Sequence, residues 1–328
     1  MKVRGEGHPS RDPLPSGSSL PTLVRVEQAA LTARLKPPRA LNLQATLRPL
    51  RNGPRDPAMF WRRDGAWRAT RTPLGPATER LYQAADGAVL VQAWGPGAEW
   101  LVDRAPQLLG ALDDDSDFRP EHPLLRDLHR RHPGLRLCRS EAVWEAALAT
   151  IVEQRVQTVE AWTAWRLMLR KLGEPAPGPL PGLYLPPAPE VLSRTPYHEF
   201  HPLHIERTRA EIVRRTAGVV NRLEEVVEMP LEDGRRRLGA VPGLGPWSTA
   251  RIALLALGDS DAVPLGDYHF PHMVSWALSG EPRGSDARML ELLEPYRGHR
   301  ARVIRLLMAG GAGAPRYGPR RPLQDWTT

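Results

Sequence analysis

Two features of the sequence could carry chemistry, and they lie close together in the chain. The first is VPGLGPWSTA, Val241 to Ala250, in which two glycines and two prolines separate segments of helical composition. Gly243 and Gly245 can take positive φ and leave backbone N–H groups uncovered at the tip of a helical hairpin. A helix that begins after Pro246 adds free N–H groups and the positive end of its dipole. The tip therefore predicts an anion site, for which a DNA phosphate is the natural ligand, although a plain turn between helices would use the same residues.

The second feature is Asp267 in AVPLGDYHFPHMV, between two apolar segments and just ahead of a predicted helix. An aspartate there can cap the helix or present a carboxylate to a substrate. Several histidines also recur at three-residue intervals, but Pro202 interrupts the first run and no thiolate or carboxylate set completes a site. These histidines are His198, His201 and His204, followed by His269 and His272. We therefore expect no zinc.

The elements that must position these residues follow from composition and periodicity. The 328 residues suggest two domains. Residues 1–38 are rich in Pro, Ser, Gly and charge and predict a disordered basic arm. Residues 39–118 carry short alternating apolar stretches and predict a small α+β domain. Residues 119–310 predict a helical core, and residues 311–328 a loose tail.

Within the helical part, SEAVWEAALATIVEQ places its apolar residues on one helical face, with Ser140 as a candidate N-cap. The next helix has Thr158 as candidate cap and Gly173 just past its end. The seven prolines between Glu174 and Pro189 predict a long loop. A helix over 231–238 leads into the hairpin tip.

Bulk properties narrow the function classes. The net charge of +8 suits a partner that carries phosphates, and equally a basic soluble enzyme. Cys138 is the single cysteine, which excludes a disulfide framework and a cysteine-ligated iron–sulfur cluster. The sequence has no apolar run long enough to span a membrane and no signal-peptide h-region, so we expect no membrane partner and a cytoplasmic location.

The two features together resemble a known family. LGAVPGLGPWSTARIALLALGDSDAVPLGDYHF, Leu238 to Phe270, is similar to the helix-hairpin-helix signature of the DNA glycosylase superfamily, in which a catalytic aspartate follows the hairpin. WEAALATIVEQRVQTVEAWTAWRLMLRKLG and EPYRGHRARVIRLL resemble the opening and closing segments of the glycosylase core. A strand-rich domain ahead of that core is the layout of the DNA-3-methyladenine glycosylase II branch. The resemblance implies a mainly α fold with the helix-hairpin-helix at 231–257.

The resemblance also implies roles for particular residues. Asp267 matches the catalytic aspartate, which would stabilise positive charge on the sugar and orient or deprotonate a water. Trp247 stands where strand-cutting members carry a Schiff-base lysine, so a monofunctional enzyme is expected. Trp247 and Tyr296 match aromatic residues of the base pocket, with core packing as the alternative. Arg251 replaces a further pocket aromatic, and an arginine is unfavourable beside a cationic base.

Three more sets of residues match family positions. The wedge that fills the gap left by a flipped base falls on Gln154 and Arg155, with Arg155 at the wedge position proper; a solvated basic turn is the alternative. The DNA-binding hairpin comprises Gly243, Leu244, Gly245, Ser248 and Thr249. A structural monovalent cation would sit on the carbonyls of Gly239, Val241 and Leu244, and no other cofactor is expected.

The sequence therefore predicts a monomeric, nucleoid-associated DNA glycosylase of base excision repair. It would bind damaged double-stranded DNA, flip out a damaged base, for which an alkylated purine is expected, and leave an abasic site. The alternative is a glycosylase-like protein that binds distorted DNA without cleavage, which the departures at Arg251 and Arg155 keep open. The iron–sulfur, strand-nicking branch is excluded by the cysteine count and by Trp247.

Overall fold

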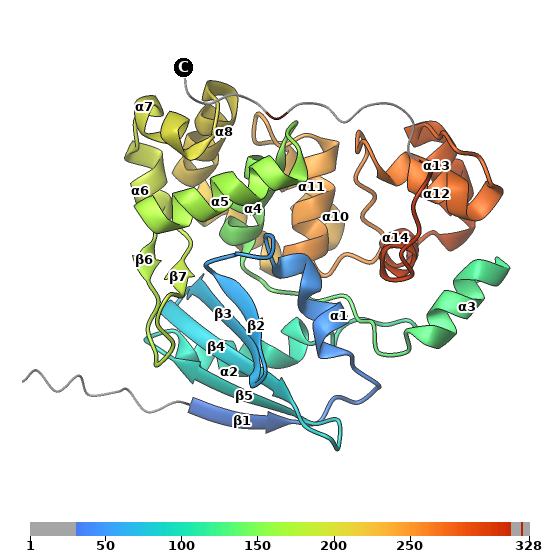
Figure 1. Ribbon diagram of the computed structural model, residues 1–328, viewed down its shortest axis with the longest axis horizontal. Coiled ribbons are helices and arrows are strands. Elements are labelled where there is room, and N and C mark those ends of the chain that lie inside the picture. Colours follow the sequence, from blue (N-terminus) through green and yellow to red (C-terminus); the bar gives the residue numbers. More distant parts are fainter. Residues whose placement is uncertain (1–30, 316–322, 324–328) are drawn as a thin grey trace, which may run out of the picture.

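The N-terminal part of the chain forms an antiparallel sheet, against which the first helices of a larger helical part pack (Figure 1). The computed structural model describes residues 31–315 and residue 323. Residues Ala66, Leu81 and Val91 lie opposite one another on three adjacent strands and are fully buried, so they form one row of the core. The strand order is β1-β5-β4-β3-β2, with β1 Leu31–Leu35, β2 Met59–Arg62, β3 Gly65–Thr72, β4 Gly75–Gln83 and β5 Val89–Trp94.

Strand β1 corrects the predicted extent of the N-terminal arm. Composition predicts a disordered arm over residues 1–38, but residues 31–35 pair with β5, with Ala33 opposite Val91. Local composition could not reveal this, because a strand at the sheet edge is stabilised by a partner far along the chain. The remainder of the predicted arm, residues 1–30, lies outside the described residues, as does most of the predicted tail.

Helices account for most of the chain after β5 (Figure 1). The helices of the first part are α1 Leu43–Leu47, η1 Arg48–Leu50, α2 Ala98–Leu108, α3 Pro123–Arg131, α4 Val143–Glu153, α5 Thr158–Leu172, α6 Pro189–Arg194, α7 Tyr197–Phe200, η2 His201–Leu203, α8 Arg207–Gly218, α9 Val220–Glu224 and η3 Glu225–Glu228. They are followed by α10 Leu231–Gly239, α11 Pro246–Ile252, the π-helical turn η4 Ala253–Leu257, α12 Phe270–Ser279, α13 Asp286–Leu293, η5 Glu294–Tyr296 and α14 Arg300–Ala309. The proline-rich loop also holds a two-residue ladder of β6 Glu174–Pro175 and β7 Tyr184–Leu185. The predicted helical core with a small antiparallel sheet ahead of it is thus confirmed, while the division into domains stays a prediction.

Two predicted helix caps are wrong by a short distance. Helix α4 begins at Val143 with Ala142 as its N-cap, not Ser140. Helix α5 is capped by Gln157 rather than Thr158, and the Gln157 N–H donates to the Glu160 carboxylate at 2.9 Å. Several polar residues near a helix start can each serve as cap, so the sequence signal identifies the helix better than its first residue.

The sheet and helices α4 and α5 share one hydrophobic core, which contains Leu81, Leu148 and Trp165. Polar contacts cross the same boundary: Trp165 Nε1 donates to Asp56 at 2.8 Å, and the buried Arg68 guanidinium of β3 forms an ion pair with Glu145 of α4 at 3.5 Å. Buried ion pairs add little net stability, but losing one partner leaves an uncompensated charge. The sheet is therefore held in one position relative to the first helices.

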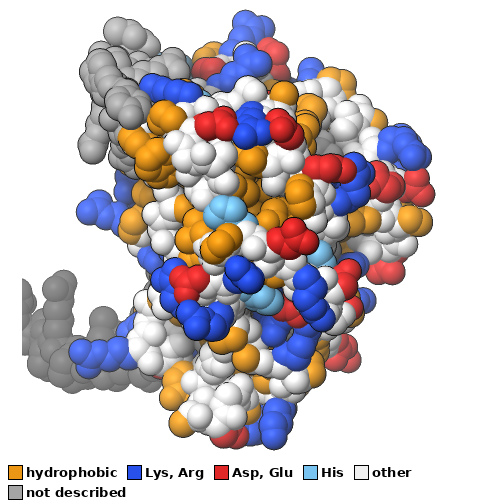
Figure 2. Space-filling view, turned by 90° about the vertical axis from the view of Figure 1, so that its right-hand side faces the viewer, with side chains coloured by type: hydrophobic (Ala, Val, Ile, Leu, Met, Phe, Trp, Pro, Cys, Tyr) orange, Lys and Arg blue, Asp and Glu red, His pale blue; other side chains and the backbone are white. Residues whose placement is uncertain are grey.

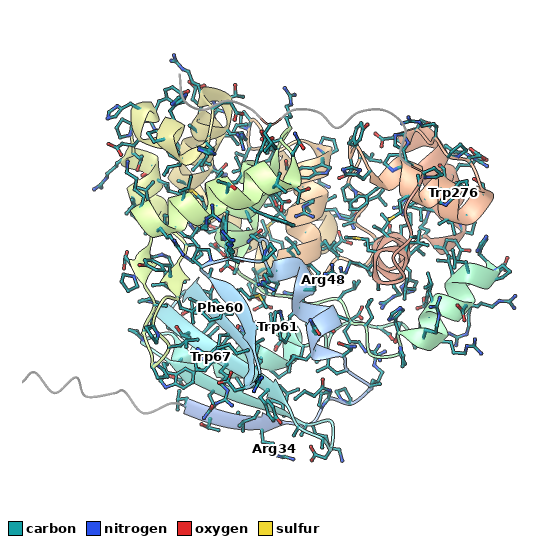
Figure 3. All side chains as sticks on the ribbon, viewed as in Figure 1. Arg34, Arg48, Phe60, Trp61, Trp67 and Trp276 are labelled. Atoms are coloured by element: carbon teal, nitrogen blue, oxygen red, sulfur yellow. The ribbon has the colours of Figure 1, made fainter. Side chains whose placement is uncertain are left out.

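A second hydrophobic cluster joins α3 to α12, α13 and α14, with Leu125, Met289 and Val303 at its centre. Val263 and Leu265 pack on its margin, so the chain that follows the hairpin is anchored to this second cluster. Figure 3 shows Trp67 in the sheet and Trp276 on α12, toward opposite ends of the molecule. The residue that sequence reasoning singles out as catalytic, Asp267, lies where the chain passes from the hairpin to α12.

The surface over the C-terminal helices carries charges of both signs. On the face seen in Figure 2, Lys and Arg side chains are interspersed with Asp and Glu. The net positive charge of the protein is therefore not gathered into a continuous basic patch on this face. Across the described residues, no helix is both long and apolar enough to cross a membrane.

Candidate active site

Helices α10 and α11 form the predicted helical hairpin, joined by residues 240–245. Gly243 has φ +104°, and a Cβ there would lie 2.5 Å from the Ile212 side chain of α8. Gly245 has φ −73°, and a Cβ there would meet nothing within 4 Å. Gly243 is therefore required by the turn and by its packing on α8. Gly245 instead leaves the tip of the hairpin bare.

Only part of the predicted DNA-binding hairpin is accessible. Gly243 and Gly245 are exposed, whereas Leu244 and Ser248 are each 2% exposed and anchor the turn to the core. The half-buried Thr249 donates from Oγ1 to the Leu244 carbonyl at 3.4 Å. Contacts between the tip and a ligand would therefore be made mainly by backbone groups.

Asp267 lies between the hairpin and α12, and both of its carboxylate oxygens have partners. Oδ1 accepts the N–H groups of His269 at 2.7 Å and Phe270 at 3.0 Å, which caps the start of α12. Oδ2 accepts the indole N–H of Trp247 on α11 at 2.9 Å. The capping role considered for this aspartate is therefore observed, and its second oxygen faces the hairpin. Three donors fix the orientation of the carboxylate.

Trp247 is half-buried and has a cationic neighbour one turn later on the same helix. The guanidinium carbon of Arg251 lies 5.5 Å from the centroid of the Trp247 ring, within the range of a cation–π interaction. Arg251 also forms an ion pair with Glu153 at the end of α4. Its Nε is buried and has no hydrogen-bond partner among the described residues. Sequence reasoning missed Glu153, because nothing in the local pattern points to a partner 98 residues away.

The two predicted wedge residues have different environments. Gln154 donates from Nε2 to the carbonyl of Gly243 at 2.9 Å and to Ser248 Oγ at 2.8 Å, so its amide is bound to the hairpin. Arg155 is exposed and has φ +58°, an uncommon conformation for a side-chain-bearing residue. The turn after α4 is thus joined to the hairpin through Gln154, and Arg155 is the accessible member of the pair.

The structure separates Tyr296 from this group. Tyr296 is 9% exposed and belongs to the second hydrophobic cluster, where its ring centroid lies 6.3 Å from that of Phe118. Core packing, the alternative considered for this tyrosine, accounts for its position. Tyr268 was not predicted, although it follows Asp267 directly: it is 74% exposed, with its ring edge-to-face on His269 at 5.0 Å. An exposed aromatic beside the carboxylate could contact a large ligand.

A groove of about 550 Å³ lies on the other face of α11 and is lined by Thr249 and Ala250, not by Trp247 or Asp267. Its two arginines are already paired, Arg235 with Asp259 and Arg300 with Asp261. The predicted cation would be held at the hairpin end of this groove, where Gly239 and Leu244 line the wall. The Val241 carbonyl accepts the Leu244 N–H at 2.9 Å and the Leu244 carbonyl accepts the Thr249 hydroxyl. Each of these two carbonyls therefore retains one free lone pair.

Comparison with known proteins gives distant relatives among DNA repair enzymes. No protein-family model matches the chain. Over 179 residues it is 24% identical to the Bacillus subtilis protein named "Putative DNA-3-methyladenine glycosylase YfjP", covering 52% of this chain and 61% of that protein. Over 217 residues it is 29% identical to the Mycobacterium tuberculosis "Probable bifunctional transcriptional activator/DNA repair enzyme AlkA", covering 62% of this chain and 42% of that protein.

The chain resembles helix-hairpin-helix DNA glycosylases of the DNA-3-methyladenine branch. Among solved structures, the 3-methyladenine DNA-glycosylase from Archaeoglobus fulgidus superposes with a TM-score of 0.70 at 19% identity, over 84% of this chain and 97% of that one. That similarity establishes the fold. The chain spans about half the length of the curated relatives that it matches.

Proposed function

We propose that this chain is a monofunctional DNA glycosylase that releases damaged bases, alkylated purines among them, and leaves an abasic site. The observation that carries the proposal is the Asp267 carboxylate, held between the hairpin and α12 by Trp247 and two backbone N–H groups. Cleavage of an N-glycosidic bond places positive charge on the sugar, and a fixed carboxylate beside that carbon stabilises it. The same carboxylate can take a proton from the water that attacks the sugar.

The monofunctional reaction rests on Trp247. A glycosylase that also cuts the strand needs an amine nucleophile, and the expected position holds an indole whose N–H is bound to Asp267. Water is then the nucleophile, so the phosphodiester backbone should stay intact after base release.

The partner in this proposal is damaged double-stranded DNA, bound by a monomer. The exposed hairpin tip at Gly243 and Gly245 offers backbone N–H groups to a phosphate, and the net charge of +8 favours a polyanion. Affinity should therefore fall steeply with salt concentration. A monovalent cation on the carbonyls of Gly239, Val241 and Leu244 would add positive charge at the same tip, and Arg155 would fill the gap left by the flipped base. The predicted nucleoid location follows from this partner.

The test is release of bases from alkylated duplex DNA by the native protein and by Asp267→Asn, scoring free bases, abasic sites and strand breaks separately. The variant removes the negative charge while an amide oxygen can still cap α12, so it should bind DNA and lose at least about a hundredfold in rate. Strand breaks should appear only after alkali treatment. Native protein that binds the duplex but releases no alkylated, deaminated or oxidised base would instead establish the non-catalytic binder.

A further inference from the structure

The face of Trp247 that could attract a cationic base already carries a cation. Arg251 lies one helical turn after Trp247, with its guanidinium carbon 5.5 Å from the ring centroid. The ion pair with Glu153 holds that guanidinium from the side of α4, and the two side chains are only 23% and 21% exposed. Arg251 is therefore fixed in place by contacts on two helices.

This arrangement changes the electrostatics beside Trp247. Cation–π attraction to an indole is worth about 0.5 to 2 kcal/mol and is available to one cation on a given face. A positively charged base beside Trp247 would compete with Arg251 for that attraction. It would also meet a like charge in a partly buried site, where solvent and salt screen the repulsion less than in water.

Arg251 also has an unused donor. Its Nε–H is buried and finds no hydrogen-bond partner among the described residues. An unsatisfied buried donor is destabilising, and a ligand acceptor that reached this N–H group would remove the cost. Neutral bases with a carbonyl oxygen or an unprotonated ring nitrogen carry such acceptors, whereas alkylation at a ring nitrogen removes one and adds positive charge.

We propose, on the basis of the glycosylase function above, that the Arg251 guanidinium, held in place by Glu153, makes this site selective for neutral damaged bases that carry a hydrogen-bond acceptor, and against cationic ones. In the reaction, the bond between the sugar and the base nitrogen breaks and its electron pair leaves with the base. A neutral base then departs with negative charge, which the guanidinium stabilises. Water adds to the sugar, its proton passes through Asp267 to solvent, and the released base takes a proton from solvent.

The experiment compares two duplexes of identical sequence with one damaged base opposite cytosine, either cationic 7-methylguanine or neutral hypoxanthine. Single-turnover release rates are divided by the spontaneous release rate of the same base, because the cationic base leaves faster without any enzyme. The native protein should enhance release of hypoxanthine at least tenfold more than release of 7-methylguanine. Arg251→Gln should lower that ratio about 2- to 30-fold, which corresponds to the loss of one cation–π contact and its like-charge repulsion.

Two matched variants separate charge from structure. Glu153→Gln removes the ion pair but keeps the cation, so the ratio should stay at the native value or rise. Arg251→Lys keeps a charge without the Nε donor, so it should still disfavour 7-methylguanine but enhance hypoxanthine release less than the native protein does. Thermal midpoints of all variants establish that they are folded.

Binding gives a readout that does not depend on turnover. In an Asp267→Asn background, the affinity for the hypoxanthine duplex should exceed that for the 7-methylguanine duplex, and Arg251→Gln should remove the difference. Equal ratios for native protein and Arg251→Gln, in release and in binding, would overturn the selectivity proposal while leaving the glycosylase function intact. Absence of release from every duplex would overturn the function, and the binding ratio would still decide the selectivity.

Discussion

Replacing Gly243 by alanine should destabilise the protein, whereas the same replacement at Gly245 should not. An alanine at position 243 must adopt φ +104°, and its Cβ would lie 2.5 Å from the Ile212 side chain. The strained backbone costs about 1 to 3 kcal/mol and overpacking against Ile212 a similar amount, so we expect a loss of about 2 to 6 kcal/mol. At Gly245 the backbone has φ −73°, which any residue can adopt, and an added Cβ would meet nothing within 4 Å.

The two glycines should therefore separate folding from DNA binding. Gly245→Ala should be neutral in stability or gain up to about 1 kcal/mol, because alanine restricts the unfolded chain. It should nevertheless weaken binding, since a methyl group at the tip keeps a phosphate away from the backbone N–H groups. Urea unfolding followed by tryptophan fluorescence and by circular dichroism measures the first effect, and anisotropy of a labelled duplex the second.

Two outcomes would contradict this reasoning. Equal stabilities of Gly243→Ala and Gly245→Ala would mean that the turn relaxes freely and that its φ is not imposed by the packing on α8. Unchanged DNA affinity of Gly245→Ala would mean that the tip does not approach a phosphate. As a control, Gly311 also has positive φ but is surrounded by open space, so Gly311→Ala should show the backbone cost without the overpacking cost.

Two further predictions concern residues near the two ends of α4. Burial raises the pKa of Glu224, which accepts the N–H of Trp144 at 2.8 Å at the start of α4, to about 7. The protonated Glu224 carboxyl should stabilise the fold fully below the unfolded pKa near 4.5. This contribution of about 3 kcal/mol should be lost as the pH rises through 7. Urea unfolding of Glu224→Gln at pH 5 and pH 8 should lack this decline, and a native-like decline in the variant would show that Glu224 is not its cause. Arg155 has φ +58°, a conformation that strains a residue with a side chain. Arg155→Gly should therefore raise the free energy of unfolding by about 1 kcal/mol, whereas Arg155→Ala should not. A gain of the same size in both variants would show that backbone strain is not the cause.

The features that the sequence determined by itself are those coded within a few residues of chain. The predicted helix over 231–238 is found at Leu231–Gly239, because an amphipathic run followed by Pro and Gly specifies a helix and its end. The hairpin and the aspartate that follows it are likewise local patterns, which is why the resemblance to glycosylases could be recognised from Leu238 to Phe270. Short-range signals were weaker at helix starts, where Ala142 and Gln157 act as caps in place of the expected residues.

Only the tertiary structure decided which of these residues meet. Arg251 lies beside Trp247 on one helix, but Glu153 reaches it because α4 packs against α11, and Gln154 binds the hairpin for the same reason. The family resemblance predicts Tyr296 in the base pocket, yet its ring packs into the second cluster with Phe118. Residues 31–35 become a strand through a partner nearly sixty residues away. Hydrophobic periodicity specifies which face of an element is buried, but the neighbour on that face is set by how the elements pack, and the polar contacts of the site depend on that neighbour.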